Sequence, residues 1–325
     1  MAYCLAAAAT GARAEFRDAS GELGFSGGGK AAFADYDNDG FVDLHAGRLF
    51  HNEGGKKFVP AVDTGAPGGE VVWGDFDNDG NVDIFQFTGK GSLHRNRGDG
   101  TFEAVEFPEL PTVNSRGAVW IDINNDSLLD LYVGGYEIWQ KAVYPDIAYR
   151  NLQGKGWAVH PFPKVRDMTA RGIAAADYDG DGVLDMLLSN HVDPDLNPPW
   201  IFTKTDDYAR NFILLGDGDG NFSKGVICEE TDTAEYYVSF VMASLDVDMD
   251  GRLDLLIGQG GDALRVCPQA EDGSFGTDKI IEAQDSGRGL WMGLAVADYD
   301  GVASQTVTAT TTNPWGFTKS TSSVT

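Results

Sequence analysis

Short apolar runs separated by polar turns extend along most of the chain. Runs such as AAFA at 31–34 and DLHAG at 43–47 flank an acidic stretch, and the same order recurs farther along. Because the runs are four to six residues long and several alternate apolar with polar positions, they predict β-strands joined as hairpins by the acidic stretches. A third run and a glycine turn follow, as in LHRNRGDGTF at 93–102. The predicted unit is four antiparallel strands.

The unit recurs at a regular spacing. The acidic stretches start at residues 35, 75, 122, 177 and 246, so successive starts lie 40 to 69 residues apart. This period, with four strands per unit, predicts an all-β fold, the β-propeller, in which a ring of sheets buries faces that one sheet would expose. A further unit begins with GLAVADYD at 293–300 and then loses the pattern. We predict six blades with an irregular last blade, and a seven-bladed parent with a truncated C-terminus is the alternative.

The two ends of the chain differ from the repeats. Residues 1–14 have a short apolar stretch followed by small residues, which resembles a signal peptide; an Ala-rich start without that role is the alternative. The propeller is predicted over residues 15–303. Its first piece, EFRDASGELGF, resembles a fourth strand that could complete the last blade. Residues 304–325 are expected to form an irregular tail or poor strands of that blade.

The acidic stretches, here called loops one to five, span 35–43, 75–83, 122–130, 177–185 and 246–254. Carboxylates about 4 Å apart repel by about 1 kcal/mol even in water, so clusters of this density favour a bound cation. Positions 1, 3, 5 and 9 of each loop offer side-chain oxygens, position 7 offers a carbonyl, and glycine at position 6 allows a sharp turn. Ordinary Asp- and Gly-rich turns closed by local hydrogen bonds are the alternative.

An EF-hand starts with the same residues but needs a glutamate at position 12 and a following helix. Position 12 holds residues that cannot supply a carboxylate, and strands flank the loops. These residues are Ala46, Gln86, Val133, Leu188 and Ile257. The sequence therefore excludes an EF-hand.

The loops, their flanking strands and the GDGTF-type turns resemble the FG-GAP or VCBS-type repeats of integrin alpha-chain propellers and of cartilage-acidic-protein-like secreted proteins. The resemblance covers Glu15 to about Asp300. In that family the loop between the first two strands of a blade holds Ca²⁺, so the resemblance implies about five structural Ca²⁺ sites. The implied ligands, with position 7 acting through its carbonyl, are Asp35, Asp37, Asp39, Phe41 and Asp43; Asp75, Asp77, Asp79, Asn81 and Asp83; Asp122, Asn124, Asp126, Leu128 and Asp130; Asp177, Asp179, Asp181, Val183 and Asp185; and Asp246, Asp248, Asp250, Arg252 and Asp254.

Two loops depart from the pattern. Loop three has Asn124 in place of aspartate and Ser127 in place of glycine, so we expect it to be the weakest of the five sites. The sixth loop keeps only Asp298 and Asp300, and we expect no metal there.

The formal net charge narrows the classes of molecule that the protein is expected to bind. A formal charge of −26 argues against nucleic acid and anionic membranes and favours cations or basic partners. No apolar run reaches the roughly 18 residues of a membrane helix.

The chain has three cysteines. Cys4 would leave with the signal peptide, and Cys228 and Cys267 form either one disulfide or two buried thiols.

Two long turns between second and third strands, at 134–147 and 190–208, and a link at 230–237 carry aromatic residues toward the face opposite the acidic loops. Such residues suit a protein surface or the apolar face of a sugar, and packing within their own loops is the alternative. The candidate ligand-binding residues are Tyr136, Trp139, Tyr144, His191, Trp200, Phe202, Tyr236 and Tyr237.

The function favoured by these features is a secreted or cell-surface Ca²⁺-binding propeller that acts as a binding or adhesion module for a protein or glycan. The alternative is a carbohydrate-acting lyase or dehydratase on the same scaffold. No catalytic residue is assigned, because the five histidines show no metalloprotease-type spacing and no nucleophile elbow or phosphate loop occurs. His51 and His94 are expected to pack blades, and His191 is the one histidine considered as an acid or base.

Overall fold

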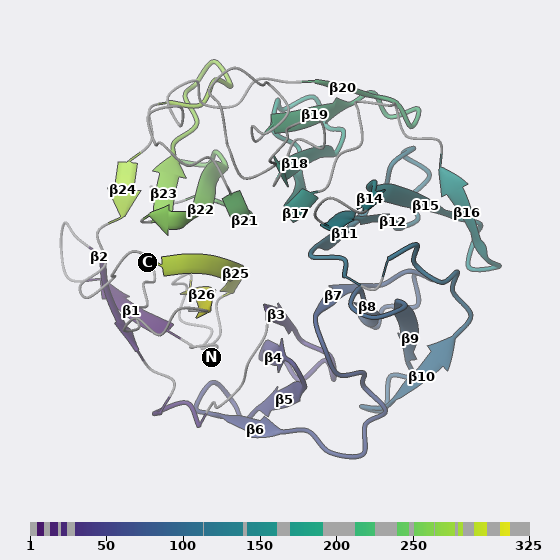
Figure 1. The fold of residues 1–325 in the computed structure, drawn as a ribbon. Coiled ribbons are helices and arrows are strands. Elements are labelled where there is room, and N and C mark those ends of the chain that lie inside the picture. The colour runs from purple at the N-terminus through teal and green to yellow at the C-terminus, as the bar shows by residue number, and fades with distance from the viewer. Residues whose placement is uncertain are drawn as a thin grey trace.

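The computed structural model describes residues 5–9, 14–18, 21–24, 30–112, 114–138, 142–160, 170–190, 212–224, 239–246, 250–262, 264–276, 279–281, 289–297 and 306–312. Within these residues the regular structure is β-strand, and the strands form sheets arranged in a ring around a central axis (Figure 1).

The described residues form five blades of four antiparallel strands each (Figure 1); four blades are separate sheets, and the fifth belongs to a six-stranded sheet that a C-terminal hairpin extends. The first blade comprises β3 (Ala31–Ala34), β4 (Asp43–Ala46), β5 (Leu49–Asn52) and β6 (Phe58–Pro60). The second comprises β7 (Val71–Gly74), β8 (Asp83–Gln86), β9 (Ser92–Asn96) and β10 (Phe102–Val105). The third comprises β11 (Ala118–Ile121), β12 (Asp130–Val133), β15 (Ile147–Asn151) and β16 (Trp157–His160). The fourth comprises β17 (Ala170–Ala176), β18 (Asp185–Asn190), β19 (Phe212–Gly216) and β20 (Phe222–Lys224), and the fifth β21 (Ser239–Leu245), β22 (Asp254–Asp262), β23 (Leu264–Cys267) and β24 (Lys279–Ile281).

The described residues contain three further hairpins beyond these blade strands, and the last of them extends the sheet of the fifth blade. At the N-terminus, β1 (Leu5–Ala9) pairs with β2 (Ala14–Asp18). The long turn of the third blade carries β13 (Tyr136–Ile138) and β14 (Ala142–Tyr144). Near the C-terminus, β25 (Gly289–Ala297) pairs with β26 (Thr306–Thr312).

The prediction of six blades, with seven as the alternative, is wrong, because the structure has five four-stranded blades. The expected first strand of a sixth unit exists as β25, but it bonds to β22 of the fifth blade at Gly260 and Asp262 instead of starting a sheet of four. The β25–β26 hairpin lies between the fifth blade and β3 of the first (Figure 1). The N-terminal piece likewise pairs with β1 and does not become a fourth blade strand.

Aromatic side chains fill the spaces between neighbouring blades. Between the second and third blades, the rings of Phe85 and Phe107 lie 4.8 Å apart and Trp120 packs on Phe85 at 6.2 Å. A Cβ atom at Gly74 would lie 2.5 Å from Trp120, so this position in β7 accepts only glycine. Burial of several rings at one interface dominates the packing energy there and fixes how the blades, and therefore the loops they carry, sit side by side.

Side-chain amides tie each of three blades to the one before it at the edge that bears the acidic loops. Asn96 donates from Nδ2 to the carbonyl of Tyr36 at 2.7 Å, and Asn151 makes the same contact with Phe76 at 2.7 Å. In the fifth blade Gln269 donates to the carbonyl of Tyr178 at 2.6 Å. Each acceptor is position 2 of the preceding blade's acidic loop, so these amides couple loop conformation to blade packing.

Cys267 is buried and takes part in a disulfide bond, which excludes the prediction of a free thiol there; Cys228 lies outside the described residues. No helix in the described part of the chain combines the length and the hydropathy that a membrane crossing requires.

Candidate metal centre

Loop one shows how an acidic loop is built. Both carboxylate oxygens of Asp35 accept backbone N–H groups, from Asp39 at 3.0 Å and from Gly40 at 2.9 Å. Asp39 accepts the N–H of Phe41 at 2.9 Å. Asp43 is fully buried at the start of β4 and accepts the N–H groups of Tyr36 and Asn52. Positions 1, 5 and 9 therefore close the turn and join it to the third strand.

The other loops repeat this arrangement. The carboxylate at position 1 accepts two backbone N–H groups from within its loop, and the carboxylate at position 5 accepts the N–H of position 7. The carboxylate at position 9 accepts a backbone N–H from the end of the third strand or from just beyond it. The carboxylates concerned are Asp75, Asp79 and Asp83; Asp122, Asp126 and Asp130; Asp177, Asp181 and Asp185; and Asp246, Asp250 and Asp254.

At position 3, local hydrogen bonds leave an oxygen without a donor in three loops, whereas in loop four Asp179 accepts the N–H of Asp181 at 3.2 Å. In loops one, two and three the Oδ1 atom at position 3, on Asp37, Asp77 and Asn124, is buried and has no hydrogen-bond partner. A buried oxygen acceptor without a partner costs about 1–3 kcal/mol. Each of these three oxygens is therefore available to a donor or a cation from outside the chain.

The acidic oxygens also converge. Ligand atoms of neighbouring carboxylates lie within 4.8 Å of one another in each of the groups Asp35, Asp37 and Asp39; Asp75, Asp77 and Asp83; and Asp177, Asp179 and Asp185. One hard cation with oxygen ligands at 2.3–2.6 Å spans such a group. The donor set therefore fits Ca²⁺.

Burial makes the position 9 carboxylates unfavourable as free anions. Loss of solvent raises the pKa of Asp83 to about 7 and that of Asp130 to about 6, although each accepts two backbone N–H groups that act the other way. The pKa values of Asp43 and Asp185 rise for the same reason. A cation inside the loop would favour the charged form and offset this cost.

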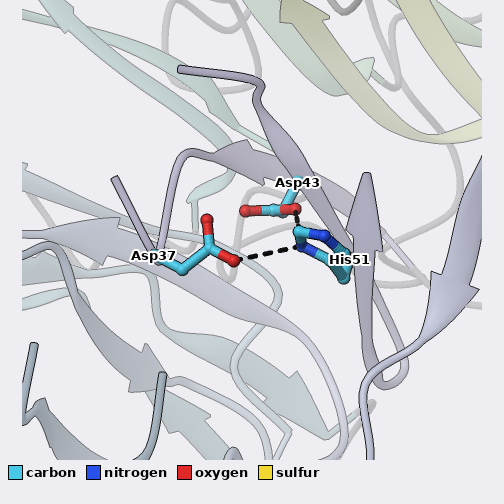
Figure 2. A group of neighbouring side chains, drawn as sticks. All are labelled: Asp37, Asp43 and His51. Carbon is cyan, nitrogen blue, oxygen red and sulfur yellow. Dashed lines mark ion pairs between the residues drawn. The ribbon is translucent and has the colours of Figure 1, made fainter. Parts of the chain in front are cut away.

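Loop one has a histidine beside it, as Figure 2 shows. The Nδ1 atom of His51 lies 3.1 Å from Oδ2 of Asp37 and 3.2 Å from Oδ1 of Asp43. These are ion-pair distances, but the ring makes no aligned hydrogen bond to either carboxylate. The prediction that His51 only packs the blade is therefore incomplete, because the ring borders the candidate metal ligands.

The residue equivalent to His51 differs from blade to blade, and this divides the loops into classes. In loop two Arg95 donates from Nε to Oδ2 of Asp77 at 2.7 Å. In loop three Arg150 lies 3.7 Å from Asp126, while loop four has the uncharged Leu215 at the same place. In loop five the equivalent residue is the uncharged Pro268, and the arginine stands instead at position 7, where Arg252 pairs with Asp250. A guanidinium in the loop competes with a metal ion for the same negative charge.

Backbone geometry explains two other loop positions. Position 4 has a positive φ in four loops, where it is Asn38 (58°), Asn78 (55°), Asn125 (57°) or Gly180 (79°). Position 6 is a positive-φ glycine in loops one, two, four and five but is Ser127 (65°) in loop three. Asparagine at position 4 tolerates the left-handed region, and glycine at position 6 adopts it without strain. Serine at position 6 has a Cβ atom that disfavours this conformation, so loop three is the strained one.

Replacing Ser127 with glycine is expected to stabilise the protein by about 0.5–1 kcal/mol, because the left-handed strain at this residue disappears. The carbonyl of residue 127, which accepts a hydrogen bond from Asn78, is unaffected by the change. Urea unfolding measures the effect. The reverse change, Gly80→Ser, is the matched control and should destabilise; a lower stability for Ser127→Gly would refute the strain.

The structure describes every metal-ligand candidate except Asp248, and Asp298 and Asp300 also lie outside the described residues. The position 7 residues donate their N–H groups to position 5, and their carbonyl role stays a prediction. Of the candidate ligand-binding residues, Tyr136 and Tyr144 face each other as a cross-strand pair of β13 and β14. Outside the described residues lie Trp139, His191, Trp200, Phe202, Tyr236 and Tyr237.

The described histidines other than His51 have bonds within the fold. His45 contacts the carbonyl of Pro67 at 2.9 Å, and burial lowers its pKa. His94 lies 3.1 Å from Ser92 Oγ, in agreement with a packing role, and His160 contacts the carbonyl of Gly220 at 2.9 Å. The loop contacts of His51 and Arg95 were missed in the sequence, although both directly precede the third-strand Asn that bonds position 9.

Comparison with known proteins supports the repeat assignment. Residues 75–133, which contain loops two and three, match the FG-GAP-like repeat family, so the chain carries an FG-GAP-like repeat. A search of the curated proteins finds no match.

Similar solved structures include Saccharomyces cerevisiae Sqt1 (11% identity, 79% of this chain and 65% of that chain covered, TM-score 0.45) and the V. cholerae biofilm matrix protein Bap1 (11%, 89% and 44%, 0.36). BBS1N in complex with ARL6DN is also similar (12%, 88% and 90%, 0.42). The chain thus spans about two thirds of the first and less than half of the second. At these values the similarity carries no argument about function.

Proposed function

We propose that this chain, a β-propeller that carries an FG-GAP-like repeat, is a Ca²⁺-binding module that recognises an extracellular protein or glycan. The observation that carries the metal proposal is the buried, unpartnered oxygen at position 3 of three loops. FG-GAP repeats are typical of extracellular proteins, which supports secretion. The propeller fold suits a binding or adhesion role, since its two faces present loops on a rigid scaffold.

Ca²⁺ in this proposal is structural. Bound Ca²⁺ supplies a double positive charge and accepts oxygen lone pairs that the chain leaves unused. Positions 1, 3, 5 and 9 would hold it by side chains and position 7 by its carbonyl. Since position 9 opens the second strand and bonds the third, fixing the loop also fixes three strands of the blade.

The loops are expected to differ in affinity. Loop four should bind Ca²⁺ most tightly, because three of its carboxylates converge and the residue equivalent to His51 is the uncharged Leu215. Loops two, three and five should bind more weakly, because an arginine pairs with a carboxylate in each. Loop three also has one carboxylate fewer, so it should be the weakest.

Replacing Arg95 with leucine should therefore raise the Ca²⁺ affinity of loop two by about tenfold, because one positive charge next to Asp77 is removed. Calorimetric titration of Ca²⁺ into the metal-free protein measures it. Arg97→Leu is the control, since Arg97 pairs with Glu103 away from the loop. Unchanged or weaker binding in Arg95→Leu would contradict the competition.

Binding to a partner is tested on protein and glycan arrays with the full chain in millimolar Ca²⁺ and in EDTA. The proposal expects at least one specific ligand whose binding is lost in EDTA together with the fold. Absence of any array ligand while the protein is folded in Ca²⁺ would count against a recognition role and leave the metal sites intact.

A further inference from the structure

A cavity of about 380 Å³ lies between the first strands of the five blades. Its walls include Lys30, Trp73, Trp120, Arg171 and Met242, which come from five different blades. Pockets of roughly 300–1,000 Å³ hold small ligands, so the space is large enough for a molecule of about the size of a sugar.

Three basic residues meet at the end of this cavity that is opposite the acidic loops. Each first strand runs toward its acidic loop, so a residue at the start of such a strand lies at the other end. Lys30 directly precedes β3, Arg116 lies two residues before β11, and Arg171 is the second residue of β17. The ammonium group of Lys30 donates to the carbonyl of Arg116 and, at 3.1 Å, to that of Arg171.

The two guanidinium groups share one aromatic ring. The Cζ atom of Arg116 lies 5.4 Å from the centre of the Tyr136 ring, and that of Arg171 lies 5.6 Å from it. Tyr136 starts β13 of the long turn, so this turn forms part of the rim. The ring's π face attracts both cations and holds them close together despite their like charge.

One hydrogen-bond donor of this basic group lacks an acceptor. The Nε atom of Arg116 is buried without a partner. A buried N–H without an acceptor costs about 1–3 kcal/mol, and it needs an acceptor from outside the chain. Glu70, directly before β7, is a carboxylate that acts on Lys30, and it balances one of the three charges.

Burial disfavours the charged form of the Lys30 side chain. Burial is the main cause that lowers the pKa of Lys30 to about 8; Glu70 raises it, and Arg116 and Arg171 lower it further. An anion bound beside these groups would favour the charged amine.

We propose that this end of the central cavity binds the oxyanion group of a small ligand, a carboxylate or a phosphate, between Lys30, Arg116 and Arg171. The site is separate from the acidic loops and does not depend on Ca²⁺ being their metal. The protein carries a net charge of −26, so an anion is repelled from the surface as a whole and is held only by this local concentration of donors.

The experiment compares three ligands that share one ring and differ in their anionic group. Glucuronate carries a carboxylate, glucose 6-phosphate carries a phosphate, and glucose carries neither. Calorimetric titration into the full chain at low salt should give saturable binding of at least one anionic ligand and none of glucose. The stronger of the two anions identifies the group.

Arg116→Gln and Arg171→Gln should each weaken this binding at least tenfold. Arg48→Gln is the matched control, because Arg48 is an exposed arginine in a turn on the same face and outside the cavity, and it should bind as the unchanged protein does. If one glutamine variant fails to fold, the other decides. No saturable binding up to roughly 10 mM of either anion, equal binding of glucose, or full binding in the folded glutamine variants would overturn the proposal.

The pH dependence of anion binding offers a second readout. Binding should weaken as the pH rises from 7 to 9, since Lys30, which lies beside Arg116, Arg171 and Glu70, loses its proton over this range. Lys30→Arg, which stays charged, should bind without this pH dependence. A pH dependence that persists in Lys30→Arg would refute the assignment of Lys30.

Discussion

Removing Ca²⁺ with EDTA is expected to lower the melting temperature by on the order of 10 °C. The reason is the cost that the metal-free loops carry, with buried carboxylates at position 9 and unpartnered oxygens at position 3. Differential scanning calorimetry in 1 mM Ca²⁺ and in excess EDTA measures the shift.

The size of the effect follows from mass action. A site with a dissociation constant of about 0.1 mM gains about 1.4 kcal/mol at about 1 mM free Ca²⁺. Five such sites gain roughly 7 kcal/mol, which is comparable with the whole stability of a typical domain. The loops that contain an arginine should contribute less, so this sum is an upper value.

Mg²⁺ is the control ion for this experiment, because it is smaller and requires a tighter octahedral shell than these loops provide. It should restore little of the lost stability. A melting temperature that EDTA leaves unchanged would mean that hydrogen bonds alone hold the loops.

Replacing Asn151 with aspartate is expected to destabilise the protein by about 3 kcal/mol. Asn151 is buried and donates from Nδ2 to the carbonyls of Phe76 at 2.7 Å and Leu129 at 3.1 Å. Aspartate has the same shape but no donor, so an oxygen would face two carbonyl oxygens and the link between the second and third blades would be lost. Urea unfolding monitored by tryptophan fluorescence measures the change.

The same substitution at Asn221 is the matched control, because that side chain is exposed and bonds only to Asp217 within its own turn. It should destabilise the protein by only about 1 kcal/mol, since the new carboxylate repels Asp217 in water and no contact between blades is lost. Equal effects at the two positions would show that the contact between blades contributes nothing.

The local part of the fold could be predicted from the sequence. Each apolar run on either side of loops one to five is a strand, and the hairpins join where the acidic residues stand, as in β3 and β4 around loop one. Alternation and turn chemistry act over a few residues, so the sequence carries them directly. The FG-GAP resemblance agrees with the family match at residues 75–133.

The number of blades could not be predicted in the same way. The run that became β25 has the apolar character of a first blade strand, but its partners are β22 and β26. Strand pairing depends on contacts between residues that are far apart in the sequence. The residues of an apolar run alone do not determine which strand it pairs with.

The basic end of the cavity was also beyond sequence reasoning. Lys30 and Arg116 are 86 residues apart, and Lys30 and Arg171 are 141 apart. Each residue stands at the start of a first strand, and aligning the repeats on their acidic loops would have brought these positions together. A charged residue beside an apolar run is ordinarily solvated, so one repeat alone gives no reason to notice it.

The most direct test of the metal sites is a crystal structure grown in millimolar Ca²⁺ and measured at a wavelength where calcium scatters anomalously. We expect anomalous peaks among the oxygens of positions 1, 3 and 5, strongest in loop four and weakest in loop three. Loops that hold only water under these conditions would contradict the Ca²⁺ sites and leave the acidic clusters without the cation that we propose.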